Sequence, residues 1–122
     1  MLIFPLKKRW FEKIKSGEKT VEYREVKLYW FKRIATEIRK QAAFIEDLDM
    51  IRALAERETI ECVMLPCKLR LGYTQQYMTA TITKIEVVNG KDTDLAIDKP
   101  VYAIHLTDVS EVKRTPLEKW HN

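Results

Sequence analysis

The sequence is poor in glycine, cysteine and long apolar runs, and each shortage excludes a class of protein. Only 3 of its 122 residues are glycine, so a glycine-rich loop that cradles nucleotide phosphates is not expected. The two cysteines, Cys62 and Cys67, are too few for a disulfide scaffold, and their spacing is not one that binds zinc. No apolar run approaches the roughly 20 residues that cross a bilayer, and residues 2–4 are too short for a secretory core. We therefore expect a cytoplasmic protein with no membrane partner, no metal and no cofactor.

The length and composition fit one small globular domain, and the charge along the chain is uneven. Of the 122 residues, 46% are hydrophobic and 33% are charged, which excludes wholesale disorder. Residues 1–40 hold 12 Lys and Arg against 5 Asp and Glu, whereas residues 41–61 hold 2 against 6. A basic end indicates either a polyanionic partner such as nucleic acid or a solvated surface.

The apolar pattern predicts an α+β domain built on a curved or closed antiparallel sheet. Strands are expected at residues 2–6, 20–25, 59–65, 67–73, 77–88 and 101–109. A short helix is expected at residues 7–16, and two more within residues 31–57, where Asp49 caps the second. The alternation of side chains slips near Thr83 and Lys84, which predicts a β-bulge there.

Residues 16–25 contain the pattern G-x-K-x-x-E-x-R and are the most informative segment. Gly17 permits a tight exit from the preceding helix. Glu22 and Arg24 are two apart on a predicted strand, so their side chains share a face and can pair. Lys19 joins that face only if the chain is still turning after the glycine. The three side chains then line one cleft suited to a phosphate or a base carbonyl; the alternative is a structural ion pair beside a surface lysine.

With its flanks, this segment resembles the ASCH family, a branch of the PUA-like β-barrel superfamily. The resemblance outside the motif lies in residues 4–8, 10–11, 27–30, 71–73 and 102–106. It implies one ASCH/PUA-like domain over residues 1–122, with a helical insertion at about 31–58. The implied fold is α+β, a PUA-like closed or nearly closed mixed β-barrel with flanking helices, and the implied role is in RNA binding.

Four further side chains are predicted to contact RNA or a nucleotide. Tyr29 and Tyr73 lie at the ends of elements, where a ring can stack on a base. Arg70 can add a phosphate contact, and His105 approaches the cleft if the last strand neighbours the motif strand. The alternatives are rings packed under the barrel rim, a surface arginine and a hydrogen-bonded structural histidine. Tyr23 points away from the motif face and is expected in the core.

Three functions remain open on the sequence alone. The first is RNA or nucleotide recognition in the motif cleft. The second is hydrolysis of RNA or a modified nucleoside, of ribonuclease or amidohydrolase type, with Glu22 as general base and Lys19 holding an oxygen. In the amidohydrolase branch of the family a threonine nucleophile follows the motif lysine by three residues, and Glu22 stands there instead. The third is a protein-interaction module, including a homodimer through the apolar stripes of residues 31–57.

Overall fold

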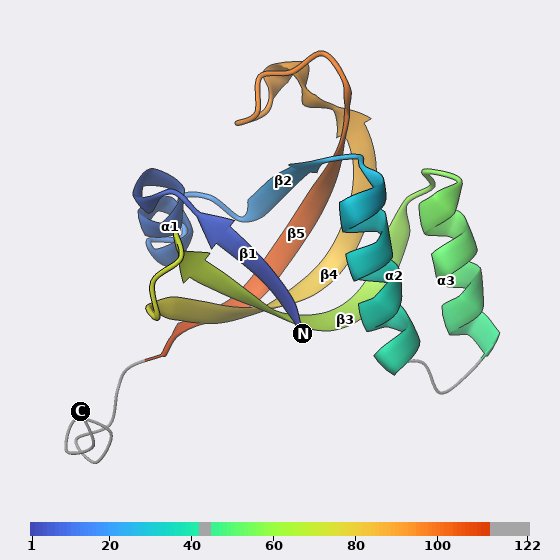
Figure 1. Cartoon of the computed structure of the whole chain (residues 1–122), viewed down its shortest axis with the longest axis horizontal. Coiled ribbons are helices and arrows are strands. Elements are labelled where there is room, and N and C mark those ends of the chain that lie inside the picture. The colour runs from blue at the N-terminus through green and yellow to red at the C-terminus, as the bar shows by residue number, and fades with distance from the viewer. Residues whose placement is uncertain (42–44, 113–122) are drawn as a thin grey trace.

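The structure is a computed structural model that describes residues 1–41 and 45–112, and in it five strands form one mixed sheet. The sheet is curled into a half-barrel, with α1 near one end and α2 and α3 packed side by side against it (Figure 1). The side chains of residues 45–48, 62 and 63 are not described. The strands are β1 (Leu2–Leu6), β2 (Val21–Glu25), β3 (Ile60–Leu71), β4 (Tyr77–Asn89) and β5 (Pro100–Glu111). The helices are α1 (Lys8–Lys15), α2 (Leu28–Gln41), α3 (Ile45–Ala55) and the short 3-10 turn η1 (Gly90–Asp92).

The strand order is β1-β3-β4-β5-β2, which leaves β1 and β2 as the two edges of the sheet. β1 pairs with β3 in parallel, and the other three pairings are antiparallel. The α+β class and a barrel-like curvature are therefore present. The sheet is not closed by strand pairing, because β1 and β2 each have one neighbour only.

The helix α1 and the turn after it form where the sequence predicts them. Phe11 and Ile14 are buried on one face of α1, three residues apart. Gly17 follows with φ of +85°, a backbone conformation that costs a residue with a side chain about 1 kcal/mol or more. The chain then enters β2 at Val21, and the residues of the motif lie directly after this turn.

Two predicted breaks differ from the structure. Asp49 lies inside α3, which begins at Ile45, so it does not cap the helix. β3 is one strand that runs through Pro66 instead of two strands divided there. Proline is tolerated because β1 pairs with β3 only from Cys67 onward, so no ladder hydrogen bond is lost on that edge. The bulge near Thr83 is confirmed by a register shift between Ile82 and Lys84.

The apolar stripes of the helical stretch are covered within the molecule. Ile34 and Ile38 of α2 and Leu54 of α3 are buried and belong to the same core cluster as the sheet residues. Residues 42–44 of the predicted stretch lie outside the described residues. No helix in the described ranges is both long and apolar enough to cross a membrane.

Candidate functional site

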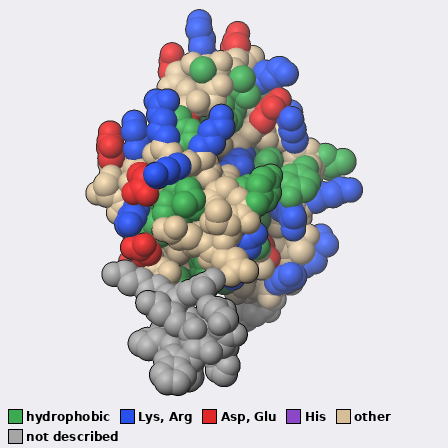
Figure 2. All heavy atoms as spheres, turned by 60° about the vertical axis from the view of Figure 1, so that its left-hand side comes forward, with side chains coloured by type: hydrophobic (Ala, Val, Ile, Leu, Met, Phe, Trp, Pro, Cys, Tyr) green, Lys and Arg blue, Asp and Glu red, His purple; other side chains and the backbone are tan. Residues whose placement is uncertain are grey.

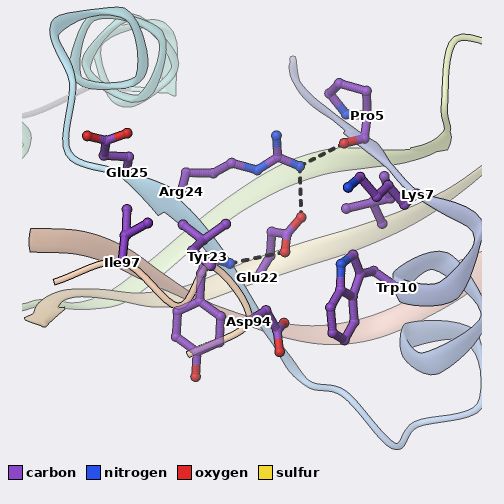
Figure 3. Close-up of a pocket in the computed structure, with 11 residues that line it drawn as sticks. Pro5, Lys7, Trp10, Glu22, Tyr23, Arg24, Glu25, Asp94 and Ile97 are labelled. Carbon is purple, nitrogen blue, oxygen red and sulfur yellow. Dashed lines mark hydrogen bonds and ion pairs between the residues drawn. The ribbon is translucent and has the colours of Figure 1, made fainter. Parts of the chain in front are cut away.

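A hollow of about 450 Å³ lies along the free edge of β2 (Figure 3). Its walls come from β2, the end of β1, the start of α1 and the loop that follows η1. The lining residues are Pro5, Leu6, Lys7, Trp10, Glu22, Tyr23, Arg24, Glu25, Asp94, Leu95 and Ile97. Four successive residues of β2 are among them. Since side chains alternate between the faces of a strand, four in a row line one hollow only if it faces the edge of the strand.

The two motif residues Glu22 and Arg24 form an ion pair at this hollow. A guanidinium nitrogen of Arg24, Nη2, donates to Oε2 of Glu22 at 2.8 Å and also to the carbonyl of Pro5 at 2.8 Å. The guanidinium lies 5.1 Å from the Trp30 ring and 5.3 Å from the Phe4 ring. Arg24 therefore spans from β2 to β1, across the seam between the two edges of the sheet (Figure 3).

The other carboxylate oxygen of Glu22 is also occupied. Its Oε1 accepts the backbone N–H of Tyr23 at 3.0 Å and lies 3.5 Å from Nζ of Lys19. Lys19 further donates to the carbonyl of Val21 and pairs with the carboxylate of Asp94. The side chains of Lys19 and Glu22 are only 8% and 7% exposed. The chain thus brings the three motif side chains into one charged cluster, and each cation in it already has an anionic partner.

Lys19 faces a second, smaller hollow beside the first. This hollow has a volume of about 300 Å³ and is lined by Lys19 but not by Glu22 or Arg24. Trp10, Tyr23 and Asp94 line both hollows and form the wall between them. The expectation of one cleft lined by all three motif residues is therefore corrected to two adjacent hollows.

Tyr23 and two residues absent from the predicted site shape this wall. Tyr23 is half-buried instead of lying in the core; burial raises the pKa of its hydroxyl, and Asp94 and Glu86 add to the effect. Trp10 belongs to the apolar stripe of α1, a pattern that also describes a core residue. Asp94 is separated from Lys19 by 75 residues, and no sequence pattern links the two positions.

The negative charge of Glu22 also affects the pKa of a buried cysteine, Cys67. Burial raises the pKa of the Cys67 thiol to about 12, and the charge of Glu22 contributes to the rise. Cys67 is a free, buried cysteine. The side chain of Cys62 lies outside the described residues. No group of three or more His, Cys, Asp or Glu that is able to hold a metal occurs in residues 1–41 and 45–112.

Three of the further predicted contact residues do not line the hollow of 450 Å³. Tyr29 is exposed on α2, where it accepts a hydrogen bond from Arg33 and lines a separate hollow of about 330 Å³. Tyr73 is 90% exposed in the turn between β3 and β4. Arg70 lies near the end of β3, opposite Pro5 of β1. These three side chains therefore do not share the lining of that hollow with Glu22 and Arg24.

The last strand does neighbour the motif strand, but His105 on it lines neither hollow at the motif. It is opposite Val21 in the pairing of β5 with β2. Its Nε2 is 3.0 Å from a carboxylate oxygen of Glu86 on β4. This hydrogen bond is the main cause that lowers the pKa of Glu86. His105 therefore has a hydrogen-bond partner within the sheet, which fits the alternative interpretation of a structural histidine.

No protein-family model matches this chain, and no curated protein and no solved structure shows significant similarity to it.

Proposed function

We propose that this chain is an ASCH-like domain of the PUA-like kind that binds RNA or a nucleotide in the hollow along β2. The observation that carries the proposal is the pair of Glu22 and Arg24, which the fold places in the wall of a 450 Å³ hollow. That volume falls in the range of small-molecule sites, about 300–1,000 Å³. Glu22 and Arg24 of the motif thus form part of the wall of a hollow that is large enough for one nucleotide.

The charges around the hollow favour an uncharged part of such a ligand inside it. Arg24 and Lys7 are the lining cations, and Glu22, Glu25 and Asp94 are the lining anions. A phosphate placed deep in the hollow meets these carboxylates, which disfavours it. A nucleobase carries polar edges and no charge, and the indole of Trp10 offers an aromatic surface beside it. We therefore place a base in the hollow and its phosphates toward the basic surface around the hollow.

Hydrolysis of RNA or a modified nucleoside ranks second, because both oxygens of Glu22 already have cationic or N–H partners and its side chain is only 7% exposed. Oε1 is held by the N–H of Tyr23 and by Lys19, and Oε2 is held by Arg24. A general base needs an acceptor within hydrogen-bond reach of the proton that it removes. The acceptor position that remains on Oε2 is the one at which Glu22 would take a proton from water, and the low exposure of the side chain limits access to it.

A protein-interaction module ranks third, because the apolar residues expected to form a dimer face are used inside the chain. Ile34, Ile38 and Leu54 are at most 2% exposed. A homodimer through α2 would therefore use its outer surface, on which Leu28 and Tyr29 are exposed.

The test is the binding of a fluorescently labelled short single-stranded RNA, measured by anisotropy for the wild type and Arg24→Lys. Lysine keeps the charge but lacks the planar guanidinium that lies beside the Phe4 and Trp30 rings, and its shorter side chain does not place an N–H donor where Nη2 lies between Glu22 and the Pro5 carbonyl. We expect a loss of affinity of about tenfold or more, the equivalent of one charge-assisted hydrogen bond. Arg52→Lys is the matched control, since Arg52 is exposed on α3 and outside the hollow. Equal affinity of the wild type and both variants contradicts the proposed site.

A further inference from the structure

The backbone of β2 presents alternate groups to β5 and to the hollow. The carbonyl of Thr20 accepts the N–H of Leu106 at 2.9 Å, and the N–H of Val26 donates to the carbonyl of Pro100 at 3.0 Å. In an antiparallel pair, every second residue of a strand exchanges hydrogen bonds with its neighbour. The even-numbered residues of β2 therefore bond to β5. The N–H and C=O groups of Val21, Tyr23 and Glu25 point to the other side, where the hollow lies.

Two of these outward groups are already capped by the motif. Nζ of Lys19 donates to the carbonyl of Val21, and Oε1 of Glu22 accepts the N–H of Tyr23 at 3.0 Å. Beyond them come the carbonyl of Tyr23 and the N–H of Glu25. Neither of these has a hydrogen-bond partner in the described part of the chain.

The open stretch is too short for another strand. An added strand needs a continuous ladder at about 4.8 Å from the edge. Here Lys19 and Glu22 close the ladder at one end, and Arg24 reaches across the seam to the Pro5 carbonyl. Of the outward groups of Tyr23 and Glu25 that remain without a partner in the described residues, the carbonyl of Tyr23 and the N–H of Glu25 are an acceptor and the donor two residues later. This pair matches a single planar group with a donor beside an acceptor, and the carbonyl of Glu25 is a further open acceptor at the end of the strand.

We infer that the carbonyl of Tyr23 and the N–H of Glu25 read the hydrogen-bonding edge of a nucleobase in the hollow. Each of the four common bases carries a donor beside an acceptor on its pairing edge, so this contact accepts a base without depending on a charge. The inference rests on the proposed function and adds to it the atoms that recognise the ligand. It also gives the three motif residues one shared role, because they cap the neighbouring edge groups and leave this pair open.

The experiment follows backbone nuclei by NMR while each of the four ribonucleoside 5′-monophosphates is added. We expect the amide proton of Glu25 to move downfield and its solvent exchange to slow, and the carbonyl carbon of Tyr23 to shift. The amide of Val26 is the internal control, because it donates to Pro100 and not to the hollow. Its exchange rate stays unchanged on titration.

A second measurement changes the ligand instead of the protein, by removing the hydrogen-bond donor from the pairing edge of the base. Each nucleotide that binds is compared with its counterpart methylated on the pairing-edge donor nitrogen, twice where that nitrogen is an exocyclic amine. The expected loss of affinity is about tenfold or more. Equal affinity for the methylated nucleotide, or binding that leaves Glu25 and Tyr23 unchanged, overturns the inference while nucleotide binding stands. If neither the nucleotides nor single-stranded RNA bind, the proposed function falls with it.

Discussion

At the scale of single residues, Asp94 controls what the ammonium group of Lys19 is able to bind. Asp94 comes from the loop after η1, and its side chain is 27% exposed, whereas that of Lys19 is only 8% exposed. Its carboxylate occupies the place at which an anionic ligand would meet the lysine. An incoming phosphate must therefore displace Asp94 or remain outside the cluster.

Asp94→Asn is expected to raise the affinity for short single-stranded RNA severalfold. The change removes a carboxylate that neutralises Lys19 and repels phosphate, while it keeps the shape of the side chain. The measurement is the same anisotropy titration at fixed salt. Asp92→Asn removes an equal charge from the neighbouring 3-10 turn. It is the control for the effect that the loss of one negative charge has on RNA binding wherever the charge lies. A weaker affinity in Asp94→Asn would instead show that the carboxylate positions Lys19 for the ligand.

The contact between His105 and Glu86 makes a pH-dependent contribution to the free energy of unfolding. The hydrogen bond lowers the pKa of Glu86 in the folded state below its usual value of 4.5. A lowered carboxyl pKa stabilises the fold above the unfolded-state pKa, and this stabilisation is lost as the pH falls through the folded-state pKa. Denaturation of Glu86→Gln from pH 6 down to about pH 3 is expected to show a shallower fall in stability than the wild type. Parallel curves for the two proteins would contradict a role for this hydrogen bond.

At the scale of elements, the turn at Gly90 holds the loop that forms one wall of the hollow. A Cβ at Gly90 lies 2.6 Å from Cγ1 of Val101 and 2.8 Å from the carbonyl of Ile97. We expect Gly90→Ala to destabilise the protein by about 1–3 kcal/mol, as overpacking does, and to weaken RNA binding because Ile97 and Asp94 move. Gly17→Ala is the comparison, since its Cβ meets no atom within 4 Å and only the φ of +85° is strained. Urea denaturation and RNA titration of both variants measure this; a Gly90→Ala protein as stable as the wild type contradicts it.

The elements also show which features the sequence predicts and which it does not. The helix α1, the turn at Gly17 and the bulge after Ile82 depend on neighbouring residues, and local patterns predict them. The continuity of β3 through Pro66 depends on where β1 begins its pairing, which is a tertiary feature. The face shared by Glu22 and Arg24 follows from strand alternation alone. The ion pair between Lys19 and Asp94 depends on the path of a loop that is distant in the sequence, and no pattern in either segment predicts it.

At the scale of the whole molecule, the seam between β1 and β2 explains why the site and the fold share residues. No strand pairing joins these two edges in the described residues, and Arg24 links them by its hydrogen bond to the Pro5 carbonyl and its contact with the Phe4 ring. A half-barrel that lacks its last ladder leaves backbone groups to be satisfied by side chains or by a ligand. The structural and the binding interpretations of the motif are therefore compatible, because the same ion pair supports the seam and borders the hollow.

The distribution of charge over the molecule leads to a prediction about salt. The chain has a net charge of +4, and Lys and Arg side chains are spread over the face on the α1 side (Figure 2). If RNA phosphates lie on this surface, binding releases counterions and the affinity falls as salt rises. About two or three phosphate contacts to a single strand predict a loss of about tenfold between roughly 50 and 200 mM salt.

The titration of short RNA at several salt concentrations is paired with the titration of one nucleoside without a phosphate. The nucleoside is expected to bind with little salt dependence, because its base sits among the neutralised charges of the hollow. An RNA affinity that stays constant over the same range would show that no phosphate is contacted. The ligand would then be a free nucleoside or base, since the hollow alone would supply all of the binding.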